Sequence, residues 1–227
     1  MQITYLGHSG LLVEGGGKRA VIDPFLSGNP LAAMAPGDVK TDAVILTHGH
    51  SDHVGDAAAI ASANDCPIIA VFELAALLEK KGVKTIGMNT GGTFEYEGIK
   101  IKMTHAFHSS SYADGDQMYY AGQPVGILLT MGGKTLYHAG DTCLFSDMKL
   151  IGERHHIDVQ AIPIGDHFTM GPEDALDAAS WIGAKHVIPL HYNTFPPIKQ
   201  DSEAFARKVG ERGLVGHPLK PGQSVEV

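Results

Sequence analysis

One short segment concentrates the side chains that bind metals. Thr47-His48-Gly49-His50-Ser51-Asp52-His53 holds three histidines and one aspartate within six residues. Imidazole nitrogens and carboxylate oxygens together suit zinc, iron or manganese. A solvated polar loop is the plainer interpretation, but it leaves this density of histidines unexplained, and burying them unpaired would be costly. The segment therefore predicts a metal site.

The spacing within this segment indicates two ions. In an extended stretch, residues two apart point the same way, so His48 and His50 can address one metal. Asp52 and His53 begin the helix expected next and can face a second metal. Gly49 is small and would leave room for the ions.

The strand before the segment would fix its position, and the irregular loop would let its side chains turn toward one point. Ala43–Leu46 is wholly apolar, which is typical of a strand buried on both faces. The alanine-rich stretch Val54–Asn64 indicates one helix. The other elements expected in the first half are strands at Gln2–Leu6, Leu11–Glu14, Arg19–Asp23 and Pro67–Val71, and a helix at Glu73–Lys81.

The second half repeats this order, with a strand-rich start followed by βα units. Gly98 and Gly133 mark hairpin turns, and Pro172 opens a helix at a position that tolerates proline. The expected elements are a hairpin over Thr93–Met103, strands at Gly126–Met131, Thr135–His138, Val159–Ile164, Val187–Leu190 and Ser224–Val227, and a helix at Ser202–Arg212. This mixture of hairpins and βα units favours an α/β fold with two sheets and helices outside them.

The composition excludes several classes of protein. The 227 residues suit one domain, 1–227, because no linker-like stretch interrupts them. A net charge of −8 gives little of the phosphate neutralisation that drives nucleic-acid binding. No apolar run is long enough to cross a bilayer and no basic signal region is seen, so a cytoplasmic protein is expected. The two cysteines, Cys66 and Cys143, do not make a disulfide framework.

Several motifs resemble one known family. The pattern histidine-x-histidine-x-aspartate-histidine is similar to the metal-binding motif of the metallo-β-lactamase fold superfamily. Segments that resemble later motifs of that superfamily follow in its order: Phe107-His108-Ser109-Ser110, Ala139-Gly140-Asp141-Thr142 and Pro189-Leu190-His191-Tyr192. Segments that resemble its bacterial and archaeal branch of metal-dependent hydrolases, related to the ascorbate-6-phosphate lactonase group, are Gly7-His8-Ser9, Ile22-Asp23-Pro24 and Gly165–Gly171.

The resemblance covers essentially the whole chain and implies a fold and a ligand set. The fold would be a four-layer αββα sandwich with the site at one edge of the two sheets. The implied ligands are His48, His50 and His108 for the first ion, and Asp52, His53 and His191 for the second, with Asp141 bridging them. The cofactors would be two divalent ions, with zinc the first expectation and manganese or iron as alternatives.

Two histidines compete for the third motif. His105 and His108 are an odd step apart and would face opposite sides of a strand. We prefer His108, because the two serines that follow it match the family pattern. His138, three residues before Asp141, is expected to be structural or to support a ligand.

Further residues are candidates for supporting ligands or contacting substrate. His8 follows the first strand and would orient a ligand or touch substrate, with a core histidine as the alternative. Asp23 would orient the histidine segment, unless it only forms a turn before proline. For His167, in the loop before the helix that Pro172 opens, substrate contact and simple exposure are both open. His155 and His156 have no partner motif and are expected to be solvated.

The expected function is hydrolysis of a small-molecule ester, lactone or phosphoester by a water activated between two metals. Asp52 would be catalytic as well as a ligand, by accepting a proton from that water. The resemblance is also compatible with a homo-oligomer, since relatives form dimers and larger rings.

Three other functions deserve comparison with hydrolysis. A diiron redox enzyme of the same fold is disfavoured, because flavodiiron relatives carry a glutamate where this chain has His50. A nuclease or phosphodiesterase acting on nucleic acid would add basic regions, and this chain has 17 Lys+Arg against 25 Asp+Glu. A non-catalytic metal-binding protein is the third alternative.

Overall fold

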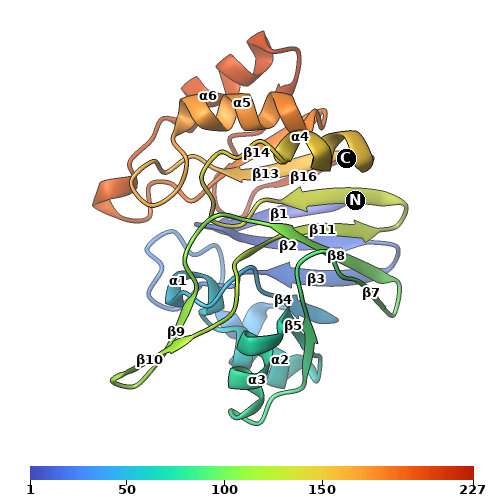
Figure 1. Cartoon of the computed structure of the whole chain (residues 1–227), viewed down its shortest axis with the longest axis vertical. Coiled ribbons are helices and arrows are strands. Elements are labelled where there is room, and N and C mark those ends of the chain that lie inside the picture. The colour runs from blue at the N-terminus through green and yellow to red at the C-terminus, as the bar shows by residue number, and fades with distance from the viewer.

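The computed structural model describes residues 1–227, and its dominant feature is a pair of seven-stranded sheets (Figure 1). The first sheet has the order β16-β1-β2-β3-β4-β5-β6. Its strands are β1 (Gln2–Gly7), β2 (Gly10–Gly15), β3 (Lys18–Ile22), β4 (Ala43–Ile45), β5 (Ile68–Val71), β6 (Thr85–Met88) and β16 (Ser224–Glu226). Pairing is antiparallel from β16 to β3 and parallel from β3 to β6.

The second sheet has the order β15-β14-β13-β12-β11-β8-β7. Its strands are β7 (Thr93–Tyr96), β8 (Ile99–His105), β11 (Val125–Met131), β12 (Lys134–His138), β13 (Val159–Pro163), β14 (His186–Leu190) and β15 (Val215–Gly216). Pairing is antiparallel from β7 to β12 and parallel from β12 to β15. The two halves therefore share one plan, as the order of expected elements suggests.

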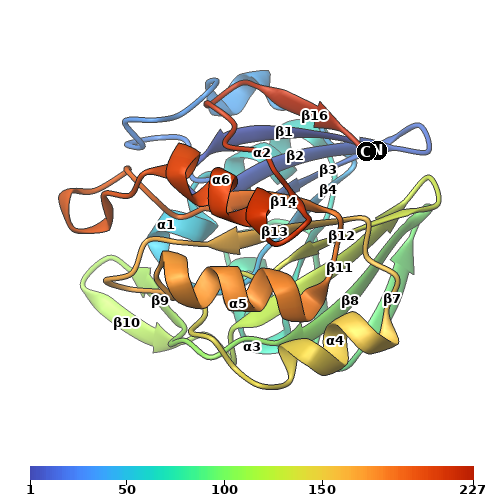
Figure 2. The ribbon, with the colours of Figure 1, turned by 90° about the horizontal axis from the view of Figure 1, so that it is seen from above.

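Three apolar cores separate four layers. The central core lies between the sheets and joins residues such as Ile45 of the first sheet to Leu190 of the second. Helices α2 (Ala57–Asn64) and α3 (Phe72–Glu79) cover the outer face of the first sheet. Helices α4 (Met148–Arg154), α5 (Pro172–Ile182) and α6 (Ser202–Glu211) cover the second (Figure 2). This confirms the αββα sandwich expected from the sequence.

Strand β4 explains why the stretch before the histidines is apolar. Ala43 and Ile45 face the core between the sheets, whereas Val44 faces the core under the helices. Successive strand residues point to opposite faces, so a strand covered on both sides must be apolar throughout. The short strand is thus a buried, rigid base for the segment that follows it.

The helix expected at Val54–Asn64 is wrong at its start. Helix α1 (Ser51–Val54) is separate from α2, because Gly55 interrupts the chain with a φ of +41°. A Cβ at Gly55 would lie 2.6 Å from the carbonyl oxygen of Pro24, so only glycine lets the two segments pass. None of the helices combines the length and the apolar character needed to span a membrane.

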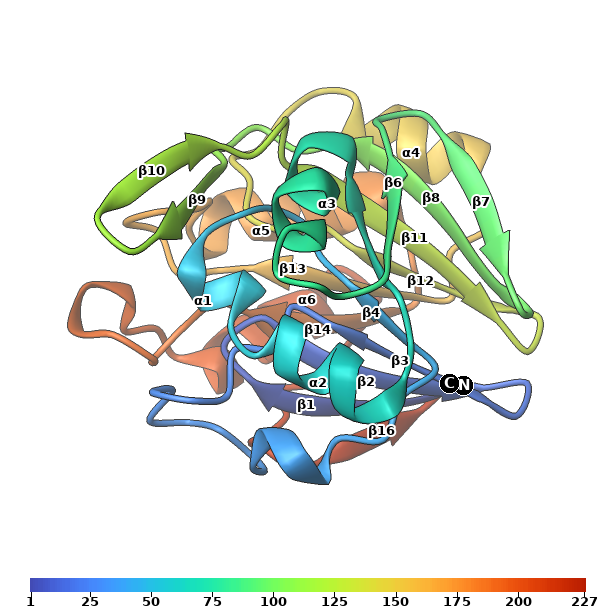
Figure 3. The ribbon, with the colours of Figure 1, turned by 90° about the horizontal axis from the view of Figure 1, so that it is seen from below.

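A two-stranded hairpin lies beside the histidine segment and has no counterpart among the expected elements. It consists of β9 (Ser111–Asp114) and β10 (Gln117–Tyr120), and Figure 3 shows it next to α1. The base of the hairpin packs on Gly49, where a Cβ would lie 2.6 Å from Ala121 Cβ. Gly49 therefore makes room for the hairpin base, rather than for the ions that its small size suggests. The sequence pattern also gives no signal for β6, α4 and β15, which are short.

We predict that Gly49→Ala destabilises the protein by about 1–3 kcal/mol, the usual cost of overpacking. The added methyl would meet the Ala121 side chain and, at 2.9 Å, the Ser111 carbonyl oxygen. Urea denaturation measures the change. The matched control is Gly37→Ala, whose Cβ would have no neighbour within 4 Å. Equal unfolding midpoints for the two variants would contradict this account of the hairpin.

Candidate metal centre

Asp23 ties the histidine segment to the first sheet. Its buried carboxylate accepts hydrogen bonds from Thr47 N at 2.9 Å and from Thr47 Oγ1 at 2.6 Å. The Asp23 backbone adopts a φ of +46°, which turns the side chain away from the strand direction. On the opposite side, Val125 N of β11 donates to Thr47 O at 3.0 Å. The segment that carries the histidines is therefore anchored to both sheets.

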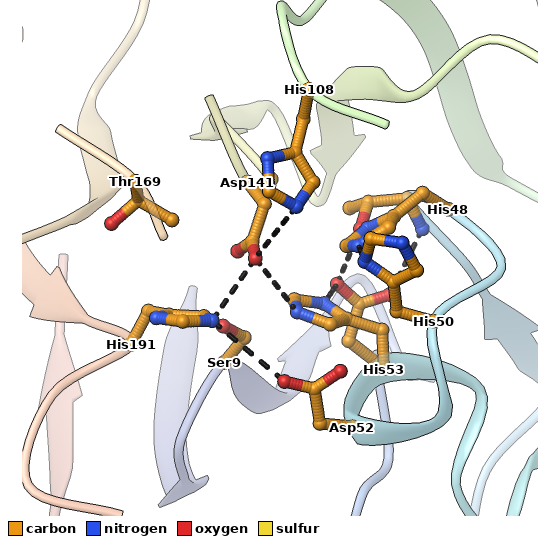
Figure 4. A network of polar contacts seen from close by, with 12 residues as sticks. Ser9, His48, His50, Asp52, His53, His108, Asp141, Thr169 and His191 are labelled. Atoms are coloured by element: carbon orange, nitrogen blue, oxygen red, sulfur yellow. Dashed lines mark hydrogen bonds and ion pairs between the residues drawn. The ribbon is translucent and has the colours of Figure 1, made fainter. Parts of the chain in front are cut away.

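Three histidines form the first candidate group. The ring nitrogens that His48, His50 and His108 can offer to an ion all lie within 4.8 Å of one another. His48 is buried, whereas His50 and His108 are partly exposed, so this group opens to solvent (Figure 4). Burial lowers the pKa of all three rings. They are therefore neutral near pH 7, which is the form that binds metal.

A second candidate group combines Asp52 and His53 with His8 and His191. Their ligand atoms also lie within 4.8 Å of one another. Asp52 and His53 belong to α1, while His8 follows β1 and His191 follows β14. His191 N donates to His8 O at 2.8 Å, and both residues have positive φ. This backbone hydrogen bond joins strand ends of the two sheets and brings the two rings together.

Asp141 lies between the two groups. It follows β12 and Gly140, whose φ is +64° and whose Cβ, if present, would lie 2.7 Å from Val125 O. Asp141 Oδ2 is 3.3 Å from the Nε2 of His53, 3.6 Å from that of His108 and 3.0 Å from that of His191 (Figure 4). One carboxylate oxygen therefore faces histidines of both groups.

The proton positions at His53 show what this centre requires. Asp23 Oδ2 lies 2.7 Å from His53 Nδ1, and an ionised carboxylate can only accept, so Nδ1 carries a proton. In a neutral ring, Nε2 then presents a lone pair to the carboxylate of Asp141. Neither His53 Nε2 nor Asp141 Oδ1 has a hydrogen-bond partner, although both atoms are buried. The carboxylate oxygen that faces His53 Nε2 is Asp141 Oδ2, so either a proton or a metal ion must lie between these two acceptors.

The pKa shifts agree with this requirement. Burial by itself lowers the pKa of His53, but the charges of Asp141 and Asp23 raise it well above its ordinary value. Burial raises the pKa of Asp141, but His53 and His191 hold it well below its ordinary value. A proton thus satisfies the pair when no metal is bound. The nitrogen and oxygen donors fit divalent zinc, manganese or iron in its place.

His8 links the second group to Thr194. His8 Nε2 lies 3.1 Å from Asp52 Oδ2, and His8 Nδ1 lies 2.8 Å from Thr194 Oγ1. Burial lowers the pKa of His8 to about 4, so the ring is neutral near pH 7. Since the ionised Asp52 can only accept, Nε2 carries the proton and Nδ1 accepts from the Thr194 hydroxyl. No motif marks Thr194, and only the fold brings it to this site.

His138 stabilises the turn that leads to Asp141. It is fully buried, its Nε2 donates to Ser9 O at 2.9 Å, and its Nδ1 accepts from Gly140 N at 3.1 Å. The ring therefore fixes the turn that precedes Asp141 and connects it to the first sheet. This is the structural role expected for His138.

Two candidate histidines lie outside both groups. His105 is exposed and stacks on Phe107 with a centroid separation of 6.1 Å, so the geometry supports the choice of His108. His167 is exposed and its ring lies edge-on to Phe168 at 4.5 Å. The structure does not bring His167 into either group, and contact with substrate stays a prediction.

Comparisons with known proteins agree with this geometry. Residues 2–191 match the family model described as a β-lactamase superfamily domain. A UPF0173 metal-dependent hydrolase of Geobacillus thermodenitrificans is 55% identical over 228 residues, covering 100% of both chains. One of Thermus thermophilus is 52% identical over 223 residues, covering 98% of this chain and 97% of the relative.

A solved structure supports the same assignment. Igni18, a metallo hydrolase from the archaeon Ignicoccus hospitalis, superposes with a TM-score of 0.90 at 38% identity. The match covers 99% of this chain and 97% of Igni18. Its fold therefore agrees with ours over nearly the whole length. Together with the clustered histidines and aspartates, these matches show that the chain belongs to the β-lactamase superfamily, and within it to the UPF0173 metal-dependent hydrolases.

Proposed function

We propose that the protein is a hydrolase with a binuclear centre that acts on a small-molecule ester, lactone or phosphoester. The proposed ligands are His48, His50 and His108 for the first ion, and Asp52, His53 and His191 for the second, with Asp141 shared. Zinc is the first candidate for both ions, with manganese or iron as alternatives.

The observation that carries this proposal is the position of Asp141 Oδ2. This single oxygen lies within 3.6 Å of the Nε2 atoms of His53, His108 and His191, which belong to two different groups. A carboxylate that served one ion would have no need to face both. Its burial also removes the competing water that would weaken such contacts.

Two divalent ions bound here would lower the pKa of a water molecule to roughly 7 and polarise a substrate oxygen. The chain itself positions the groups around that water. His48 and Asp141 are buried, while the Asp52 side chain is 26% exposed, so Asp52 lies where solvent and substrate enter.

Asp52 is the proposed proton acceptor. Its pKa is held below the ordinary value: burial raises it, but the hydrogen bond from His8 Nε2 and the nearby charge of His53 lower it more. Asp52 is therefore ionised near neutral pH and can take a proton at an oxygen. His8 holds Oδ2 in place, and Thr194 in turn fixes the His8 ring.

A direct test loads the protein with zinc, manganese or iron and offers chromogenic lactones, esters and phosphodiesters. Metal-dependent turnover of one class is the expected result and would identify the reacting centre as carbon or phosphorus. Uptake of oxygen with a reductant, and no hydrolysis of any class, would instead indicate diiron redox chemistry and overturn the proposal.

We predict that His50→Ala lowers the metal content from two ions per chain to about one, because the first group loses a ligand. Hydrolysis should fall by on the order of 100-fold or more. Elemental analysis of the purified protein measures the stoichiometry. His105→Ala is the matched control, since that exposed ring lies in neither group. Normal metal content in His50→Ala would show that the first ion is held differently.

We predict that Asp23→Asn weakens metal binding by about 10–100-fold, the usual effect of removing a carboxylate that orients a ligand. The amide keeps the size of the side chain but no longer fixes the proton on His53 Nδ1. A competition titration with a chromogenic chelator measures affinity. The control, Asp116→Asn, lies on the exposed hairpin and should leave affinity unchanged. An unchanged affinity in Asp23→Asn would limit Asp23 to holding the Thr47 backbone.

A further inference from the structure

The second sheet carries a recess far along its strands from the candidate metal ligands. The C-terminal end of α4 lies over the outer face of the second sheet (Figure 2). Where α4 ends at Arg154, residues of β7, β8, β11 and β12 line a hollow of about 440 Å³. Lys100 and Lys102 of β8 point to this face, since Ile99 and Ile101, which alternate with them, point to the central core. None of the candidate metal ligands lines the recess.

The recess gathers three unpaired cations of a chain in which most lysines and arginines form no ion pair. Carboxylates pair with seven of its seventeen lysines and arginines, namely Lys18, Arg19, Lys81, Lys84, Lys134, Lys208 and Arg212. Lys100, Lys102 and Arg154 line one hollow, and none of them forms an ion pair. The carboxylate of Glu95, opposite Lys100 in the β7–β8 ladder, points to the same face but forms no ion pair with Lys100.

Hydroxyl groups add donors to these cations. Thr93, Thr130 and Thr135 line the same recess. Thr130 Oγ1 and Thr135 Oγ1 lie 3.0 Å apart, so one donates to the other and the second keeps a free O–H. Lys102 Nζ donates to Gly91 O at 2.9 Å, which fixes one cation and leaves it two further N–H donors.

Cations surround one histidine of the recess. His155 lines the hollow, and its pKa is lowered first by burial and then by the charges of Lys102 and Arg154. His156 lies at the rim, where its Nε2 is 3.6 Å from Asp158 Oδ1. The sequence predicts that both rings are solvated. His156 is exposed and lies near a carboxylate, whereas His155 is half-buried beside the cations.

We propose that this recess binds a small phosphate-bearing molecule. Lys100 and Lys102 are two residues apart on one strand, roughly 7 Å, a span that suits one or two phosphate groups. The planar guanidinium of Arg154 can bind such a group through two parallel hydrogen bonds. The volume lies within the range of small-molecule sites. An extended polyanion is disfavoured, because the chain as a whole carries a net charge of −8.

The test is a titration of the metal-loaded protein with inorganic phosphate and with glycerol phosphate, at constant ionic strength. Amide NMR shifts report where each probe binds, so binding at the metal centre is seen separately. We expect shifts at Thr93, Lys100, Thr130 and Thr135, and a Kd at least tenfold weaker in Lys100→Ala/Arg154→Ala. Tighter binding of glycerol phosphate than of phosphate would assign the ligand to the phosphate monoesters, and the reverse to free phosphate.

The matched control is Lys80→Ala, which removes an exposed lysine of the same charge outside the recess. Lys80→Ala should keep the Kd within twofold, and both variants should keep wild-type metal content and hydrolysis. Shifts confined to the metal centre, or an unchanged Kd in Lys100→Ala/Arg154→Ala, would overturn the proposal. So would tighter binding of an oligonucleotide or of anionic lipid vesicles than of either small probe.

Discussion

His53 lies between two buried carboxylates, with Asp23 on its Nδ1 and Asp141 on its Nε2. Three such groups cannot share a dry interior without a cation, because each lone pair removed from water must meet a positive charge or a proton. The geometry around them follows from this need. Asp23 holds the backbone of the histidine segment as well as the ring, so the same carboxylate sets both the position and the protonation of a candidate ligand.

The two sheets bring these groups together at one edge of the fold. His8 and Asp23 follow strands of the first sheet, while Asp141 and His191 follow strands of the second. Backbone hydrogen bonds across the sheets, such as His191 N to His8 O, fix their separation. A rigid strand end and a short irregular loop give each ligand a defined direction, which a metal centre requires. The fold therefore concentrates negative charge and lone pairs at one edge.

The same second sheet carries the opposite charge elsewhere. Its strand ends hold candidate metal ligands, whereas Lys100 and Lys102 in the body of β8 place cations on its outer face. The two environments share the rigid frame of the β8, β11 and β12 ladder but no side chain. The candidate metal ligands and the residues of the proposed anion site therefore occupy separate parts of one frame.

The sequence by itself determined the fold class and the seven candidate ligands, because strand-end motifs in a known order carry that information locally. It also placed most strands, since burial on both faces demands apolar runs such as Ala43–Leu46. It could not determine that Gly55 divides the expected helix, since that break depends on Pro24, whose carbonyl oxygen would lie 2.6 Å from a Cβ at Gly55. The tertiary structure alone decided that Thr194 fixes His8, that His105 faces solvent, and that Lys100 and Arg154 line one recess. Such contacts join residues tens to hundreds of positions apart, and no local pattern encodes them.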